Sequence, residues 1–287
     1  RSARAEKMTL EVTMSLKGNV ALITGSSRGI GRGIALALAD QGVRVAINYY
    51  ENEAAAADTL ARVRERGSDG FSVRADVSHP EEIKRMFEEV AKELGKLDIF
   101  VSNARTTLPS FYQKPLELSL EQWETAINSQ ARAFLVSAQE SARIMPDGGR
   151  LVAITYAPGS RTGSWQPWVA MGSSKAALES LVRYFAVALG SRGITVNSIS
   201  PGGIFGPPNI VEGSVLRALP QGVQDATQAW HEGGWTPMGR LGTPEDIGNA
   251  VVLLCRPEAS FITGQTIYVD GGASIMDTIF PLEIQRG

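Results

Sequence analysis

VALITGSSRGIG, residues 20–31, joins a short apolar strand to a glycine-rich turn and to the start of a helical pattern. Gly25 suits the tight turn, Gly29 lets a pyrophosphate approach the backbone, and Gly31 lets the helix pack closely on the sheet. The free N–H groups at the start of that helix favour an anion. The stretch therefore predicts a dinucleotide-binding α/β fold.

The same alternation of strand and helix continues along the chain. Short β-branched runs are separated by segments whose apolar residues recur at helical spacing. Strands that are apolar on both faces and separated by helices indicate a parallel sheet covered on both sides. We expect a single doubly wound α/β domain of Rossmann type over residues 16–287. Its predicted strands are 20–24, 43–48, 71–75, 97–102, 150–155, 194–200 and 266–270.

Two segments depart from this alternation. Residues 1–15 are polar, without an apolar run, and we expect them to be a disordered tail or an expression remnant. Residues 203–240 are rich in Gly and Pro and carry two tryptophans. A long insertion after a strand's carboxyl end typically forms a substrate lid in such folds, although a plain surface loop is the alternative.

Composition excludes several kinds of partner. The formal net charge of −2 implies no basic face for nucleic acid, and no apolar run approaches the ~20 residues of a membrane span. The single cysteine, Cys255, cannot form an internal disulfide, and with only His79 and His231 it cannot build a Cys/His metal site. We expect a cytoplasmic protein without a metal, membrane or nucleic-acid partner.

The end of the second predicted strand bears on the nicotinamide cofactor. An acidic residue there would bind the ribose 2′-hydroxyl of NAD, but the chain has Asn48, Tyr49 and Tyr50. Arg28, within the glycine loop, can reach a 2′-phosphate with its planar guanidinium. We therefore expect NADPH rather than NADH.

Four motifs occur in the order seen in the short-chain dehydrogenase/reductase superfamily, which the chain resembles from about residue 17 to 273: TGSSRGIG, LDIFVSNA, the helix containing Lys175, and ITVNSISPGGI. One departure is Arg105, where the family has glycine after Asn-Ala. Asp76 and Asn103 could also be ordinary turn residues. The resemblance implies a homotetramer and cofactor contacts from Gly25, Ser27, Arg28, Gly29, Ile30, Gly31, Asn48, Tyr49, Asp76, Val77, Asn103, Ala104, Lys175, Pro201, Gly202 and Ile204.

Ketone-reducing members of that superfamily resemble one another in a Ser, Tyr, Lys set, often with Asn. Asn128 and Lys175 match, but Tyr156 occupies the serine position and Met171 the tyrosine position. A hydride added to a carbonyl carbon leaves an alkoxide that needs a proton at once, which methionine cannot supply. A hydride added instead to the β-carbon of an α,β-unsaturated thioester leaves an enolate, and the oxygen of this enolate needs a hydrogen-bond donor.

With these two replacements the chain resembles the enoyl-acyl carrier protein reductases, a branch of the same superfamily. That branch has a tyrosine seven residues before the lysine, where this chain has Trp168, whose indole N–H donates a hydrogen bond but no proton. The resemblance rests on Thr155-Tyr156 and on a spaced set formed by Met171, Gly172, Lys175, Leu178, Glu179, Arg183 and Tyr184.

These residues receive the following expected roles. Tyr156 is the donor, and Trp168 shapes the acyl pocket or assists through its N–H. Lys175, costly to bury alone, binds the ribose hydroxyls of the cofactor. Arg105 and Met171 line the substrate pocket. Packing in the core is the alternative role for Tyr156, Trp168 and Met171.

We therefore expect an NADPH-dependent enoyl reductase of fatty-acid synthesis, acting on thioesters of acyl carrier protein or coenzyme A. One alternative is a ketone, 3-oxoacyl or hydroxysteroid dehydrogenase that uses Tyr156 as donor. Another is an NADPH-binding sensor or scaffold without catalysis. If the protein is an enoyl reductase, the acyl chain would contact apolar residues of the insertion, namely Ile210, Val211, Val215, Leu216, Leu219 and Trp230.

Overall fold

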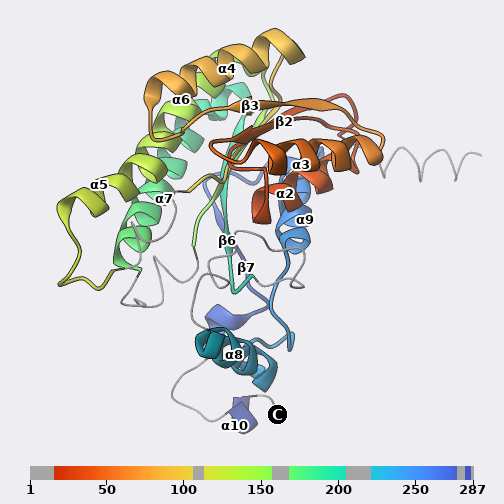
Figure 1. Cartoon of the computed structure of the whole chain (residues 1–287). Helices are drawn as coiled ribbons and strands as arrows, with labels where there is room; N and C mark the ends of the chain where they lie inside the picture. Colours follow the sequence, from red (N-terminus) through yellow and green to blue (C-terminus); the bar gives the residue numbers. More distant parts are fainter. Residues whose placement is uncertain (1–15, 106–112, 157–167, 205–220, 277–281, 286–287) are drawn as a thin grey trace, which may run out of the picture.

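A parallel sheet of seven strands, in the order β3-β2-β1-β4-β5-β6-β7, forms the centre of the molecule (Figure 1). The computed structural model describes residues 16–105, 113–156, 168–204, 221–276 and 282–285. The doubly wound α/β fold predicted from the sequence is confirmed, and every predicted strand is present. The strands are β1 Val20–Ile23, β2 Arg44–Tyr49, β3 Gly70–Arg74, β4 Ile99–Ser102, β5 Arg150–Ile154, β6 Thr195–Pro201 and β7 Thr266–Val269.

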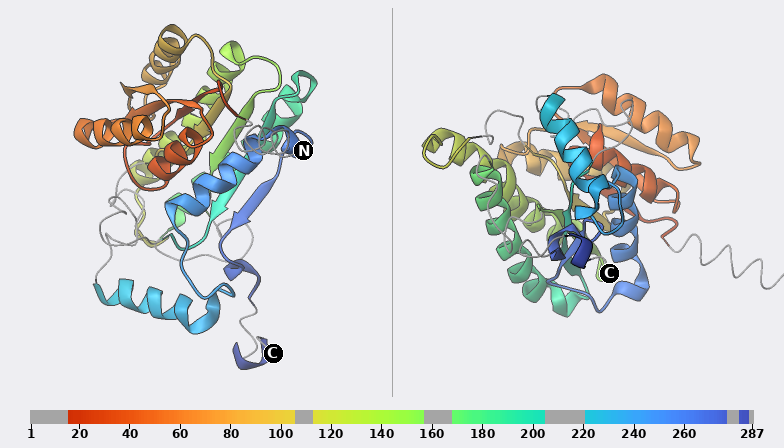
Figure 2. Two further views of the ribbon diagram at one scale, coloured as in Figure 1. Left: turned by 90° about the vertical axis from the view of Figure 1, so that its right-hand side faces the viewer. Right: turned by 90° about the horizontal axis from the view of Figure 1, so that it is seen from below.

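Helices cover both faces of this sheet (Figures 1 and 2). Successive strand residues point to opposite faces, so Leu22 joins one apolar core with Phe87 while Ile23 joins the other with Ile34. One layer holds α2 Gly29–Ala39, α3 Glu53–Glu65 and α9 Pro244–Cys255; the other holds α4 Pro80–Leu94, α6 Ala133–Ile144 and α7 Val169–Leu189.

Helices α2 and α9 touch backbone to backbone. A Cβ on Gly248 would lie 2.6 Å from the carbonyl oxygen of Gly33, and a Cβ on Gly33 would collide with Pro244. A capping box starts α9, in which the Thr243 hydroxyl accepts from the Asp246 N–H and the Asp246 carboxylate accepts from the Thr243 N–H. The first described helix is therefore fixed against one formed late in the chain.

Further elements lie near the carboxyl ends of the strands. Helix α5, Leu120–Ile127, continues through the π-helical segment η1, Asn128–Arg132, into α6. In the predicted insertion, residues 205–220 lie outside the described residues, as does the predicted tail 1–15. The rest of the insertion includes α8, Gln221–Trp230, and the π-helical η4, His231–Trp235, beyond the carboxyl ends of β6 and β7 (Figure 1).

Short elements complete the described chain. Trp230 and Trp235 stack with ring centroids 4.6 Å apart, which ties α8 to η4. Among the described helices, none combines the length and apolarity needed to cross a bilayer. The remaining elements are the 3-10 turns η2 Gly190–Arg192, η5 Pro257–Ala259 and η6 Ala273–Ile275, and the helix α10 Leu282–Gln285.

Candidate active site

The glycine loop between β1 and α2 forms a closely packed backbone cradle. Gly25 and Gly29 have φ values of 64° and 57°, in the left-handed region that favours glycine. A Cβ on Gly31 would lie 2.6 Å from the Asn103 side-chain nitrogen. Arg28, the N-cap residue of α2, makes no side-chain cap hydrogen bond, and the helix N-terminus faces the loop. The cradle fits the pyrophosphate of a dinucleotide.

Two buried or half-buried asparagines hold this loop. Asn48 Oδ1 accepts from the Gly25 N–H at 2.9 Å, while its Nδ2 donates to the Ala75 carbonyl at 3.1 Å. Asn103 Nδ2 donates to the carbonyls of Thr24 and Gly25 at 2.9 and 3.1 Å. Both side chains therefore bond the loop backbone, and their predicted contacts to a cofactor stay predictions.

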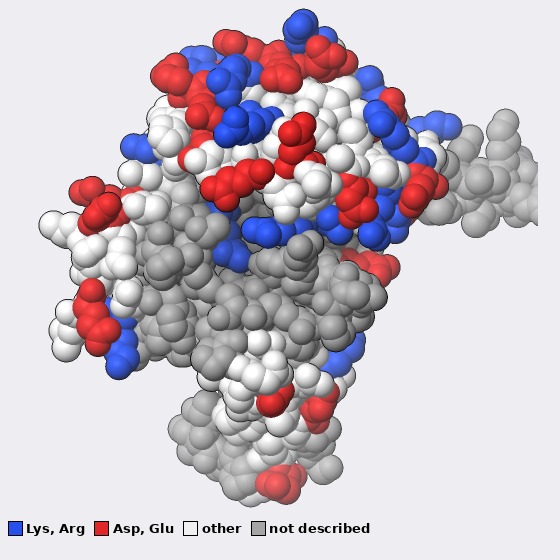
Figure 3. Space-filling model, viewed as in Figure 1, with Lys and Arg blue, Asp and Glu red and all other residues white. Residues whose placement is uncertain are grey.

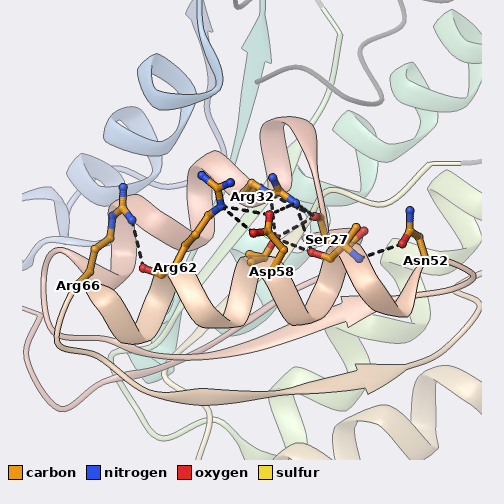
Figure 4. A network of polar contacts seen from close by, with 8 residues as sticks. Ser27, Arg32, Asn52, Asp58, Arg62 and Arg66 are labelled. Atoms are coloured by element: carbon orange, nitrogen blue, oxygen red, sulfur yellow. Dashed lines mark hydrogen bonds and ion pairs between the residues drawn. The ribbon is translucent and has the colours of Figure 1, made fainter. Parts of the chain in front are cut away.

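Helix α3 supports the same loop from outside (Figure 4). The carbonyl of Ser27 accepts from Arg32 Nη2 and from Thr59 Oγ1, each at 2.8 Å. Arg32 also forms an ion pair with Asp58 at 3.0 Å. Arg62, one helical turn further along α3, forms a second ion pair with the same carboxylate. Neither Arg32 nor Thr59 was predicted from the sequence. The one signal there is the hydroxyl of Thr59 on the otherwise apolar inner face of α3.

Cationic groups lie close to the cradle. Arg28 is exposed, and Arg105, after β4, lies near enough that the two charges repel each other. Burial and this repulsion lower the pKa of Arg105 to about 10. Figure 3 shows Lys and Arg side chains in a row across the middle of one face, beside the residues drawn in grey. An anionic ligand is favoured there.

The residues after β3 and β6 shape the edges of the site. Asp76 accepts from the Ser78 N–H at 2.8 Å, a turn-forming contact, and Val77 is buried. After β6, the N–H of Gly202 donates to the Val269 carbonyl at 3.0 Å, and Ile204 bridges to Gly242. Pro201 ends β6 in the buried interior. Their roles toward a cofactor remain predictions.

Lys175 lies in α7, at the carboxyl end of β5. Its side chain is 5% exposed, and Nζ donates to the Ile154 carbonyl at 2.6 Å. Burial, and after it repulsion by Arg105, lower the pKa of Lys175 to about 7, and Glu179 acts in the opposite direction. Lys175 can therefore change its charge near neutral pH, which is typical of functional lysines.

Tyr156 and Trp168 stack face to face beside this lysine-bearing helix. Their ring centroids are 5.8 Å apart and their planes differ by 25°. Burial raises the pKa of Tyr156 to about 12, so its phenol keeps its proton and can donate a hydrogen bond. Trp168 is buried in a small apolar cluster with Met171, so packing accounts for part of what both residues do.

Asn128 is the first residue of the π-helical segment η1, which packs against α7. π-Helical segments are rare in proteins, and those that do occur are frequently found at functional sites. The structure therefore brings predicted residues from six strand ends, from η1 and from α7 to one edge of the sheet. In the described residues, no group of three or more His, Cys, Asp or Glu could hold a metal ion.

A doubly wound parallel sheet, a glycine cradle after β1 and a buried lysine beside β5 define a dinucleotide-binding oxidoreductase of Rossmann type. The chain belongs to the short-chain dehydrogenase/reductase family: a family model described as Enoyl-(Acyl carrier protein) reductase matches residues 25–274. The superfamily resemblance predicted from the motifs is confirmed.

Two curated relatives differ in their substrates. The chain is 38% identical over 259 residues to 1-cyclohexenylcarbonyl-CoA reductase of Streptomyces collinus, covering 90% of this chain and 87% of that protein. It is 33% identical over 262 residues to tetrahydroxynaphthalene reductase of Pyricularia oryzae, covering 90% of each. The family is thus shown by relatives that act on different compounds.

Solved structures agree on the fold. The angucycline C-6 ketoreductase LanV with bound NADP superposes with a TM-score of 0.80 at 31% identity, covering 91% of this chain and 98% of that one. A short-chain dehydrogenase of Burkholderia cenocepacia in complex with NADP gives a TM-score of 0.78 at 31% identity, covering 90% and 99%.

Proposed function

We propose that the protein is an NADPH-dependent reductase of the carbon-carbon double bond of α,β-unsaturated acyl thioesters. The observation that carries the proposal is the replacement of the usual tyrosine by Met171, which lies 5% exposed in an apolar cluster, while the Tyr156 phenol stacks on Trp168 nearby. Similarity to a relative named as a reductase of an unsaturated CoA ester supports it.

The glycine cradle and Arg28 favour NADPH as the cofactor, and the NADP-bound neighbours support this choice. Gly25 and Gly31 let the loop pack closely on the residues after β4, Gly29 takes the left-handed turn before α2, and the exposed Arg28 is free to turn toward the 2′-phosphate. When bound, NADPH supplies the hydride for the β-carbon of the substrate. Lys175 binds the ribose hydroxyls.

The chain's own residues then act on the thioester carbonyl. Negative charge develops on its oxygen as the β-carbon is reduced, and a donor aimed at that oxygen stabilises the transition state. The Tyr156 phenol, kept protonated by burial, is that donor, and the α-carbon of the enolate then takes a proton from solvent to give the saturated thioester. Trp168 and Met171 shape the acyl pocket, and the positive charge of Arg105 favours the developing anion.

The thioester carrier is coenzyme A or acyl carrier protein. The Streptomyces relative is named for a CoA ester, whereas the matching family model is described for acyl carrier protein and supports a place in fatty-acid synthesis. Steady-state kinetics with crotonyl groups on each carrier will separate the two, because the better carrier gives the higher kcat/KM.

Ketone reduction is the second candidate. Asn128, which belongs to the ketone-reducing pattern, lies on the π-helical segment against α7. The naphthalene and angucycline reductases among the relatives also favour it. In this case Tyr156 donates its proton to an alkoxide from the position usually held by serine.

One experiment decides between these functions. Purified protein is mixed with NADPH and either crotonyl-CoA or acetoacetyl-CoA, and loss of reduced nicotinamide absorbance is followed. We expect oxidation with crotonyl-CoA, lost in the Tyr156→Phe and Lys175→Met variants. Oxidation with acetoacetyl-CoA alone would establish ketone reduction. NADPH binding without turnover of either thioester would favour the sensor or scaffold.

We also propose a homotetramer that uses α7 and the β7 edge of the sheet. Tyr184 and Val187 on α7 are 74% and 85% exposed, and Leu253 and Phe261 near β7 are 61% and 101% exposed. Exposed apolar groups on two faces favour association. Light scattering should give four times 30.7 kDa, and Val187→Glu should lower this mass.

A further inference from the structure

A buried carboxylate, Glu179, lies one helical turn after Lys175 in α7. Both side chains are 5% exposed. Residues four apart on a helix are neighbours, so the carboxylate and the ammonium share one face of α7. Acidic groups are almost never buried without partners, because removing their charge from water is costly. The position of Glu179 therefore requires an explanation beyond packing.

The partner of Glu179 on the sheet is Thr155. The Thr155 hydroxyl, also 5% exposed, donates to Glu179 Oε1 at 2.6 Å. Lys175 Nζ donates to the carbonyl of the preceding residue, Ile154, also at 2.6 Å. Two short hydrogen bonds thus join α7 to consecutive residues at the end of β5. Tyr156 is the next residue along the chain.

We propose that Glu179 is a positioning residue for the reaction. Its carboxylate is the buried counter-charge of Lys175, and through the Thr155 hydroxyl it fixes the end of β5 that carries Tyr156. This inference rests on the proposed function, since it takes the roles of Lys175 and Tyr156 from there. Glu179 itself touches neither substrate nor cofactor in this scheme.

The charges around Lys175 determine in which direction the loss of Glu179 would shift the pKa of this lysine. Arg105, after β4, repels the ammonium, and Glu179, on α7 itself, attracts it. Tyr156, after β5, faces the same site as a neutral phenol, and Arg28 acts on Arg105 from the glycine loop. Without the charge of Glu179, Lys175 would face Arg105 uncompensated and would lose its proton at lower pH.

Two nearly isosteric variants separate the two parts of this role. Glu179→Gln keeps an acceptor oxygen for Thr155 but removes the charge. Thr155→Val keeps the charge but removes the hydrogen bond. Exposed Glu258→Gln and half-buried Thr125→Val, whose hydroxyl donates to the Glu121 carbonyl, are the matched controls.

For Glu179→Gln, we expect the alkaline limb of the kcat profile with crotonyl-CoA to move to lower pH. A fall in kcat of roughly tenfold on that limb corresponds to a displacement of about one pH unit. For Thr155→Val, we expect a fall of roughly tenfold at every pH without displacement. Thr155→Ser, which keeps the hydroxyl, should restore most of the activity.

A direct titration keeps this test separate from the identity of the substrate. The side-chain carbon signal of Lys175 is followed against pH in protein labelled with [ε-13C]lysine, with Lys175→Met assigning the peak. We expect a lower midpoint in Glu179→Gln than in the wild type and in Glu258→Gln. An unchanged midpoint would overturn the proposal, even if the wild type reduces crotonyl-CoA.

If the wild type fails to reduce crotonyl-CoA but the midpoint still moves, the proposed function fails and the pairing of Glu179 with Lys175 stands. Circular dichroism and thermal melting establish that each variant folds. Should Glu179→Gln not fold, Glu179→Asp replaces it, because a shorter carboxylate keeps the charge and lengthens the contact to Thr155. Full activity in Glu179→Asp would then contradict the positioning role, because only the contact to Thr155 is lengthened.

Discussion

The Tyr156 ring lies on the Trp168 indole with centroids 5.8 Å apart, so the second residue after β5 and the residue before α7 form one aromatic pair. Tyr156→Phe keeps this stacking and removes only the O–H. We expect thioester reduction to fall by roughly 10²- to 10⁴-fold, the usual contribution of a positioned proton or hydrogen-bond donor. Stopped-flow single turnovers with NADPH and crotonyl-CoA measure it.

Trp168→Phe is the control for this prediction, because it keeps an aromatic ring and loses the indole N–H. We expect a smaller loss than in Tyr156→Phe. A larger loss would identify the indole N–H as the main donor to the thioester oxygen.

The support of the glycine loop by α3 gives a second prediction. Thr59→Val removes the hydroxyl that donates to Ser27 and accepts from Arg32. We expect NADPH to bind about fivefold more weakly, because a lost buried hydrogen bond costs about 1 kcal/mol. Fluorescence titration gives the Kd. Equal affinity in Thr59→Val and the wild type would show that the loop holds its shape without the Thr59 hydroxyl.

Arg28 provides a test of cofactor choice. Arg28→Ala removes the guanidinium that we assign to the 2′-phosphate, so we expect KM to rise about tenfold for NADPH and to stay nearly constant for NADH. The comparison of kcat/KM for the two cofactors checks this. Arg85→Ala, an exposed change on α4, is the control, and a parallel loss for both cofactors would assign Arg28 to the pyrophosphate instead.

The lowered pKa of Lys175 predicts that the free energy of unfolding depends on pH. Its pKa is about 7 in the folded protein against an ordinary 10.5. Between these values the unfolded chain binds a proton at Lys175 that the folded protein lacks, so this lysine makes stability rise with pH across the window. Below pH 7 its unfavourable contribution is complete and constant.

Urea denaturation of wild type and Lys175→Met between pH 7 and pH 9 measures this contribution. We expect the wild type to gain free energy of unfolding relative to the variant as the pH rises. A constant difference between the two proteins would mean that Lys175 titrates near its ordinary value.

Cys255 should serve as a reporter of unfolding. It is 3% exposed in α9, and burial raises the pKa of its thiol to about 12. Because the thiolate is the reactive form, we expect no reaction with an aromatic disulfide reagent at pH 8 until the protein unfolds. One equivalent should react in urea, whereas rapid reaction of the native protein would show that α9 opens locally.

Local patterns predicted the sheet and the glycine cradle well. Gly25 and Gly31 lie where their spacing after a strand placed them, because a tight turn and a close helix depend on neighbouring residues. The direction of the Asn48 side chain and the Thr155–Glu179 hydrogen bond depend instead on elements far apart in sequence. Neither propensity nor spacing carries that information, and the same holds for the π-helical start at Asn128.

The backbone contact between α2 and α9 has a consequence for the growing polypeptide. About 200 residues separate the two helices, so at ribosomal rates of roughly 5–20 residues per second α2 waits some 10–40 s for the surface that covers it. During that interval the side of α2 that carries Gly33 and Ala37 lacks its partner helix. The packing of α2 in nascent chains of this protein should therefore be completed only after α9 leaves the exit tunnel.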